Sequence, residues 1–189
     1  MASRREKAPV RSMRRIALVI CEGQTEESYL CLLKKWYKSP VRIVAQVKGA
    51  SITSQFVSKR KQELKLSPRD IVYAFLMYDM DVAEVNERLM SCQEDTELLL
   101  SNPCFEIWPL LHVKDQTAAL NSESVLRELK NSRAEWKRYN KAVFTDTQQQ
   151  CLKNHVQDAV ERAKKLKEFQ NPSSGIYKLI ELLETTTEG

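Results

Sequence analysis

Apolar stretches and helical periodicities alternate along the first part of the chain. Short, nearly continuous apolar stretches predict buried strands at 16–21, 41–47 and 71–78, with a weaker one at 98–100. Amphipathic spacing predicts helices between them, at about 25–37, 51–65 and from the residues after 81 to about 92. This alternation predicts an α/β fold with a mostly parallel sheet flanked by helices on both faces.

Helical patterns dominate the rest of the chain. We expect helices at 104–112, 122–131, 151–169 and 176–183, with 171–175 as a loop. Strands are hard to find after residue 113, and the sequence contains no internal repeat. The simplest interpretation is one domain over 16–189 with a helical C-terminal part, preceded by a basic arm over 1–15.

Charge is concentrated at the N-terminus. Residues 1–15 carry six basic side chains and one acidic side chain, which accounts for the net charge of +5 of the whole chain. Such arms often contact phosphate backbones, although a solvated tail has the same composition. Both interpretations of the arm stay open.

Several classes of protein are disfavoured by what the sequence lacks. No apolar run approaches the roughly 18 residues of a membrane span, and no signal-type segment follows the basic start, so we expect a cytoplasmic protein without a membrane partner.

The five cysteines form no C-x-x-C pair, and only two histidines occur. A bound metal should therefore have oxygen ligands, as Mg²⁺ or Mn²⁺ prefers. No P-loop is present, so any ATP-driven step needs another chain.

Two carboxylates follow the first predicted strand. Glu22 interrupts the strand just before Gly23, and Glu26 falls in the first turn of the next helix. Ligands of open α/β sheets bind at the carboxyl ends of strands, which makes Glu22 a candidate metal ligand. Glu26 is also favoured at a helix start by the helix dipole alone.

A second acidic pair follows the most apolar strand. Asp79 and Asp81 alternate along an extended segment, so both carboxylates can face one point. Two such charges repel each other unless a cation lies between them. Alternatively, Asp81 serves as the N-cap of the following helix.

One acid occurs in an apolar helix. Glu106 lies among apolar neighbours, and a buried carboxylate needs a partner. That partner is either a backbone N–H at the helix start or a metal or lysine of the site. His112 at the end of this helix is more typical of packing or capping than of metal binding.

Two basic segments are candidates for substrate binding. Lys59, Arg60 and Lys61 share the outer face of a predicted helix. Lys137, Arg138 and Lys141 are interleaved with aromatic residues, a pattern suited to base stacking and phosphate contact or to a solvated loop.

Three segments together resemble the RloB family of prokaryotic abortive-infection proteins. They are V-I-C-E-G-Q-T-E at 19–26, Y-D-M-D at 78–81 and S-N-P-C-F-E-I-W-P-L-L-H at 101–112. Parts of the tail, at 163–166, 171–172 and 177–180, also fit this family. Its members are compact relatives of the Toprim domain, similar to the Toprim parts of OLD-type nucleases and of the PARIS effector.

The resemblance implies a Toprim-like α/β fold and a Mg²⁺- or Mn²⁺-dependent phosphodiesterase site. Glu22, Glu26, Asp79 and Asp81 would be metal ligands and catalytic residues, and Glu106 would be a further catalytic residue. The resemblance also implies a role in phage defence with an ABC- or AAA-type ATPase as partner, and it leaves a homodimer open. PARIS-like relatives suggest RNA, particularly tRNA, as substrate, and OLD-type relatives suggest DNA.

Overall fold

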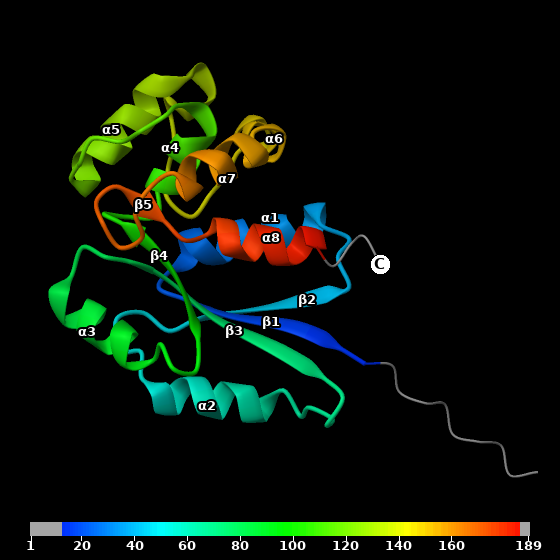
Figure 1. Ribbon diagram of the computed structural model, residues 1–189. Helices are drawn as coiled ribbons and strands as arrows, with labels where there is room; N and C mark the ends of the chain where they lie inside the picture. Colours follow the sequence, from blue (N-terminus) through cyan, green and yellow to red (C-terminus); the bar gives the residue numbers. More distant parts are fainter. Residues whose placement is uncertain (1–12, 186–189) are drawn as a thin grey trace, which may run out of the picture.

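A computed structural model describes residues 13–185 and shows a five-stranded sheet between layers of helices (Figure 1). The strand order is β2-β1-β3-β4-β5, with β1 to β4 parallel and β5 antiparallel to β4. The strands are β1 (Arg15–Cys21), β2 (Val41–Val47), β3 (Ile71–Asp79), β4 (Glu97–Asn102) and β5 (Ser173–Ser174). The predicted α/β fold with a mostly parallel sheet is confirmed.

The helices of the first half alternate with the strands, as predicted. They are α1 (Gln24–Trp36), α2 (Ser54–Glu63) and α3 (Ala83–Ser91). Figure 1 shows α2 and α3 on one side of the sheet and α1 on the other, together with the last helix, α8 (Tyr177–Thr185). Helices on both faces are the usual consequence of parallel connections between strands.

The central strand β1 packs into a separate core on each face of the sheet. Ala17, Val19 and Cys21 join the core that α1, α8 and the C-terminal helices complete. Leu18 and Ile20 join the core beneath α2 and α3. A strand buried on both faces has no polar alternation, which explains the continuous apolar pattern of 16–21.

The register brings the strand ends to one edge of the sheet. Cys21 is aligned with both Val47 and Met77, and Asp79 with Ser101. Residues that directly follow β1, β2, β3 and β4 therefore meet along a single carboxyl edge.

The second half is helical, as expected, but two details of the prediction are wrong. It contains α4 (Ile107–Val113), α5 (Ser122–Ser132), the 3₁₀ turn η1 (Ala134–Trp136), α6 (Asp146–Asn154) and α7 (Val156–Lys164). The helix predicted at 151–169 is interrupted at His155, and α6 and α7 run in different directions (Figure 1). The segment predicted as a loop at 171–175 includes β5, which pairs with the end of β4.

The N-terminal boundary of the fold differs slightly from the prediction. Arg14 forms an ion pair with Asp70, and Arg15 already belongs to β1. Arg14 and Arg15 therefore belong to the folded part of the chain, whereas residues 1–12 of the predicted arm lie outside the described residues. Among residues 13–185, no helix has the length and apolarity needed to cross a membrane.

Candidate active site

Two of the predicted acids meet at the carboxyl edge of β1 and β3. Glu22 directly follows β1 and donates its backbone N–H to the Met77 oxygen at 3.2 Å. Its carboxylate accepts the backbone N–H of Asp79, the last residue of β3, also at 3.2 Å. The predicted convergence of Glu22 and Asp79 is thus present, because the two strands are neighbours in register.

Glu26 lies on the same edge and also stabilises the start of α1. Its side chain is buried, and its Oε2 accepts the backbone N–H of Gly23 at 3.1 Å. Burial raises the pKa of Glu26, and the charges of Glu22 and Glu106 raise it further. The helix-start explanation for Glu26 therefore holds, and the residue is nevertheless a neighbour of the other acids.

Asp79 is the most strongly perturbed acid of this edge. Burial is the main cause that raises its pKa to about 8, followed by the negative charges of Glu26, Glu22 and Glu106. Its Oδ1 is buried and has no hydrogen-bond partner. A buried carboxylate oxygen without a partner is costly, so this atom is poised to accept a proton or a cation.

Asp81 lies outside this buried group. It is exposed, although its charge contributes to raising the pKa values of Glu22 and Asp79. The alternative that Asp81 is a helix N-cap is wrong, because Val82 occupies the N-cap position of α3.

Glu106 has its partners in the C-terminal half of the chain. It is 1 % exposed, and its Oε1 lies 3.3 Å from the Tyr139 hydroxyl, which donates to it, and 3.4 Å from the Lys141 ammonium. The sequence left open whether Glu106 pairs with a backbone N–H at the helix start or with a metal or lysine of the site, and the structure shows a lysine, Lys141. Glu106 is itself the N-cap residue of α4 but makes no capping bond through its side chain.

Lys141 supplies positive charge to this acidic edge. Partial burial acts against its charged form, but the charge and contact of Glu106, followed by the charge of Asp79, outweigh that effect and raise its pKa. Lys141 also lowers the pKa of Glu22, although burial and Asp81 leave that pKa raised overall. We define the acidic edge as Glu22, Glu26, Asp79 and Glu106 together with Lys141.

The acidic edge has the donor chemistry of a magnesium or manganese site without enclosing an ion. Its ligating atoms are carboxylate oxygens, which suit both ions. Within residues 13–185, however, no three or more His, Cys, Asp and Glu side chains are close enough together to hold a metal. The donor types fit, and side-chain movement would be needed to surround an ion.

The predicted basic residues of α2 are not at the acidic edge. Arg60 pairs with Glu63 at 2.5 Å, and the Lys61 ammonium donates to the Asp95 backbone oxygen at 2.6 Å. Asp95 precedes β4 and so lies near the opposite end of the sheet. Lys59 is exposed on the same helix.

The second predicted basic segment is only partly available to a ligand. Trp136 is fully buried and Tyr139 is 3 % exposed, so neither aromatic ring can stack on a base, and that part of the prediction is wrong. Lys137 and Arg138 are exposed. Lys141 alone of the six predicted basic residues contacts the acidic edge.

Sequence reasoning missed Lys48, whose backbone lies beside the end of β1 while its side chain extends to Phe56 of α2, a ring that Arg60 also covers. Lys48 directly follows β2, its backbone N–H donates to the Cys21 oxygen at 3.0 Å, and its ammonium lies 4.7 Å above the Phe56 ring. The available signal was its position after a strand, the same signal that identified Glu22. Gly49 next to it has a φ of +66°, a conformation that favours glycine.

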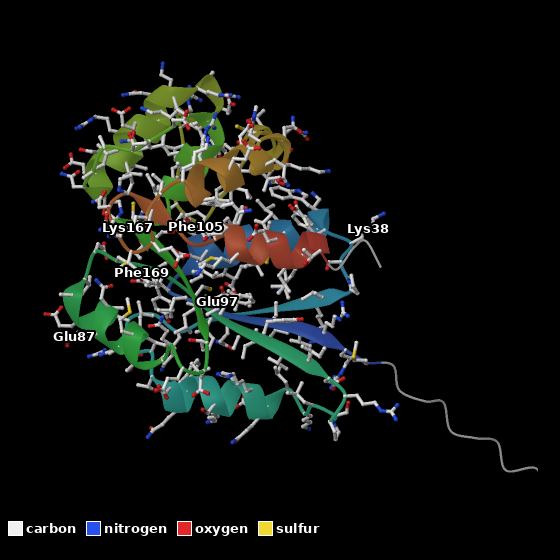
Figure 2. All side chains as sticks on the ribbon, in the orientation of Figure 1. Lys38, Glu87, Glu97, Phe105, Lys167 and Phe169 are labelled. Carbon is white, nitrogen blue, oxygen red and sulfur yellow. The ribbon has the colours of Figure 1, made fainter. Side chains whose placement is uncertain are left out.

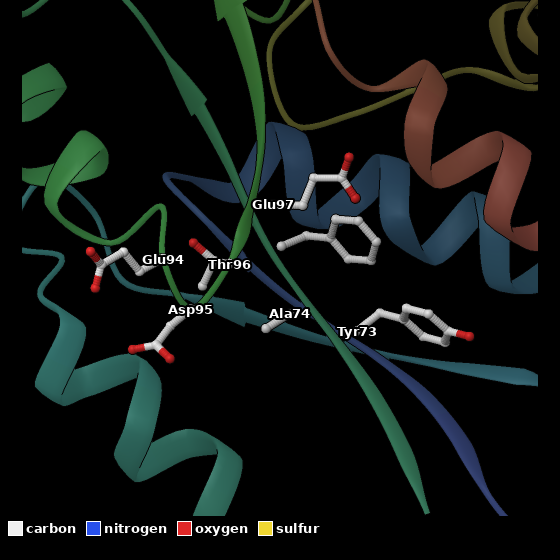
Figure 3. Close-up of a pocket in the computed structure, with 7 residues that line it drawn as sticks. Tyr73, Ala74, Glu94, Asp95, Thr96 and Glu97 are labelled. Carbon is white, nitrogen blue, oxygen red and sulfur yellow. The ribbon is translucent and has the colours of Figure 1, made fainter.

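Two further features are separate from this chemistry. His112 is buried, and its Nδ1 lies 2.9 Å from the Trp108 backbone oxygen, consistent with the packing role expected from the sequence. A surface pocket lined by 73–75 and 94–97 lies around the start of β4 (Figure 3). That pocket includes none of the predicted site residues.

Comparison with known proteins gives a family and nothing closer. No curated protein matches the chain, and no solved structure matches it. The model of one family, described as RloB-like protein, matches residues 17–183 and so includes every residue of the acidic edge. The chain therefore belongs to the RloB-like protein family.

Proposed function

We propose that this protein is a Mg²⁺- or Mn²⁺-dependent nuclease that hydrolyses phosphodiester bonds in nucleic acid. The observation that carries the proposal is the acidic edge, where Asp79 presents a buried Oδ1 without a hydrogen-bond partner near the carboxylates of Glu22, Glu26 and Glu106. Buried like charges with raised pKa values concentrate at functional sites more often than in purely structural positions.

Glu22 and Asp79 would hold the ion, with Asp81 and Glu26 as further ligands. When bound, such an ion polarises the scissile phosphate and lowers the pKa of water. Lys141 would contact a phosphate oxygen, and Glu106 would position Lys141 through the 3.4 Å contact between them. Burial of Glu106 supports this positioning role, because a buried carboxylate keeps its partner in place.

The biological role proposed here follows from membership in the RloB-like family. We propose an effector of an anti-phage abortive-infection system, acting with a separate ABC- or AAA-type ATPase. The lack of a P-loop in the sequence supports a second chain for any ATP-driven step. RNA, particularly tRNA, is our preferred substrate over DNA.

The test compares Glu22→Gln with the wild type on tRNA and on duplex DNA in Mn²⁺, with and without the ATPase. Glu27→Gln is the matched control, because Glu27 is a neighbouring acid in the first turn of α1 that is not part of the acidic edge. We expect cleavage by the wild type and by Glu27→Gln, and a loss of at least about 100-fold in Glu22→Gln. Equal cleavage by Glu22→Gln, or none by the wild type with its activated ATPase, would contradict the proposal.

A second candidate function is a non-catalytic subunit that docks on the ATPase. The observation that favours it is that the acids within residues 13–185 do not enclose a metal site. This alternative predicts no heat of Mn²⁺ binding in calorimetry and full phage protection by Asp79→Asn. The nuclease predicts binding of Mn²⁺ and loss of protection in that variant.

A further inference from the structure

We propose that a groove at the C-terminal end of α1 binds a base and the adjoining backbone of single-stranded nucleic acid that extends from the acidic edge. The proposal rests on the proposed nuclease function and adds that the substrate of the nuclease is single-stranded. We call this surface the Trp36 groove. It consists of two adjoining hollows that share Trp36 and Lys153.

The Trp36 groove lies between α1 and the start of the α6–α7 pair. One hollow, of about 290 Å³, is lined by Lys35, Trp36, Asp146, Gln149, Gln150 and Lys153. The other, of about 200 Å³, is lined by Trp36, Tyr37, Lys153 and Val156. Each hollow thus combines a tryptophan side chain with a lysine.

Trp36 is supported from inside the protein and open on its other side. Its ring makes a T-shaped contact with the buried Tyr29, with ring centroids 6.4 Å apart and planes at 80°. The rest of the half-buried side chain lines both hollows. An aromatic ring fixed in this way offers a stacking platform for any base, because every base has a π-face.

A short chain segment connects the Trp36 groove to the acidic edge. Residues 141–146 run from Lys141 of the acidic edge to Asp146 of the groove. This segment lies on α1, where Ser28 donates to the Ala142 oxygen at 2.7 Å and Thr25 accepts the Ala142 N–H at 3.1 Å.

The separation suits a strand of a few nucleotides. Trp36 follows Glu26 by ten residues of α1, which corresponds to about 15 Å along the helix axis. A nucleotide of a single strand spans at least about 3.4 Å, so this distance corresponds to at most about four nucleotides.

The charge of the groove complements a phosphate backbone. Lys35 and Lys153 line it, and Asp146 is the acidic residue among the lining side chains. Lys34 is exposed beside Lys35 on α1, and Lys38 lies just beyond the end of that helix (Figure 2). Because Trp36 is recessed in a hollow, only an unstacked base can reach it, which favours a single strand over a duplex.

Intrinsic fluorescence offers a direct test, because Trp108 and Trp136 are fully buried whereas Trp36 is half-buried. An oligouridylate of about ten nucleotides, a matching DNA strand and a duplex would be titrated into the full-length chain in EDTA. We expect both single strands to quench the fluorescence and the duplex to bind more weakly. Comparing the affinities of the RNA strand and the DNA strand shows which of the two nucleic acids the groove prefers.

Variants of the groove sharpen the test. Trp36→Leu should weaken single-strand binding by about 5- to 100-fold, and Trp36→Phe should retain most of it without the quenching. Lys153→Glu should also weaken binding and reduce its salt dependence. Lys167→Ala, at an exposed lysine away from the groove, should bind like the wild type. If Trp36→Leu does not fold, the exposed Lys153 position still tests the proposal.

Three outcomes would overturn the inference. They are binding of single strands to the wild type without quenching, equal affinity of the wild type for duplex and single strand, and wild-type affinity of the folded Trp36→Leu and Lys153→Glu variants. In the last case, loss of ATPase binding by the two variants would identify the groove as a protein-docking surface. Since these titrations contain no metal, failure of the nuclease proposal leaves them interpretable. Cleavage that is lost in Glu22→Gln but unaffected by Trp36→Leu would support the nuclease proposal and contradict a role of the Trp36 groove in substrate binding.

Discussion

At the residue scale, the central feature is a group of carboxylates whose neighbours oppose their ionisation. Asp79 combines burial with the nearby charges of Glu26 and Glu22, and its Oδ1 has no hydrogen-bond partner. Such an arrangement lowers the stability of the metal-free fold, a cost that is common in functional sites.

Asp79→Asn should therefore stabilise the metal-free protein. Removing the ionisable group relieves the repulsion and keeps the shape of the side chain, so we expect a gain of about 1–2 kcal/mol in the free energy of unfolding. Urea denaturation in EDTA measures this change. Glu84→Gln, at an exposed acid of α3, serves as the control and should change stability little. A destabilised Asp79→Asn would contradict the interpretation of the acidic edge.

His112 should make stability depend on pH. Burial is the main cause that lowers its pKa to about 4, whereas an unfolded chain has a histidine pKa of about 6.5. Between these values the unfolded state binds the proton more readily, so falling pH favours unfolding. The contribution of this residue is complete above about pH 6.5, and about 2 kcal/mol of it should be lost by about pH 5.

Urea denaturation across that pH range measures the effect. His112→Gln should remove this contribution, so that stability rises less with pH, or falls more, than in the wild type, because the raised pKa of Asp79 contributes a slope of the opposite sign. His155→Gln keeps His112 and should retain the slope. An unchanged slope in His112→Gln would show that other groups cause the pH dependence.

At the scale of elements, the capping residues of α6 explain why this helix begins earlier than the apolar pattern predicted. Thr145 is the N-cap of α6 and accepts the Gln148 N–H at 3.4 Å, and the Gln148 side chain accepts the Thr145 N–H at 2.9 Å. This capping box sets the start of α6 at Asp146, five residues before the predicted start.

Thr145→Ala should cost about 1 kcal/mol of stability, because it leaves a backbone N–H of α6 without its partner. Thr145→Ser retains the capping oxygen and should restore most of that loss. Thermal unfolding of the two variants beside the wild type provides the measurement. Equal loss in both variants would point to the threonine methyl group rather than to the cap.

The extent to which the elements could be predicted depends on their burial and length. β1 and β3 are buried on both faces, and their apolar runs predicted both strands almost to the residue. β5 has only two residues, too few to show a pattern, and it forms by pairing with β4. The break at His155 was not visible, because apolar residues continue at helical spacing across it.

The candidate site could be predicted where it depends on strand ends and not where it depends on distant packing. The family resemblance placed Glu22 and Asp79 in one site, and they meet because the strands at whose ends they lie are adjacent and parallel. The contact of Glu106 with Lys141 joins residues 35 positions apart in the chain, and no local pattern shows it. Trp136 and Tyr139 resembled exposed stacking residues because aromatic and basic side chains also alternate where a loop packs onto a core.

At the scale of the whole molecule, the helical half and the sheet share one core. The core on the α1 side includes residues of β1, α1, α4, α7 and α8. Within residues 13–185, the helices of the C-terminal half thus pack into the same core as the sheet.

The chain should accordingly unfold in one cooperative transition. Two of the three tryptophans, Trp108 and Trp136, lie in the helical half and report on it by fluorescence, whereas far-UV circular dichroism follows the sheet as well. We expect the two signals to give the same urea midpoint. Separate midpoints would show that the sheet and the helical half unfold independently.

The long-range contact of Glu106 with Lys141 also has a consequence for biosynthesis. A ribosome releases the acids of β1 and β3 well before Lys141, and β5 joins the sheet still later. At about 5–20 residues per second, several seconds separate the emergence of Glu22 from that of Lys141. A nascent chain thus carries its carboxylates without their lysine, so the protein acquires its complete site only after Lys141 has emerged.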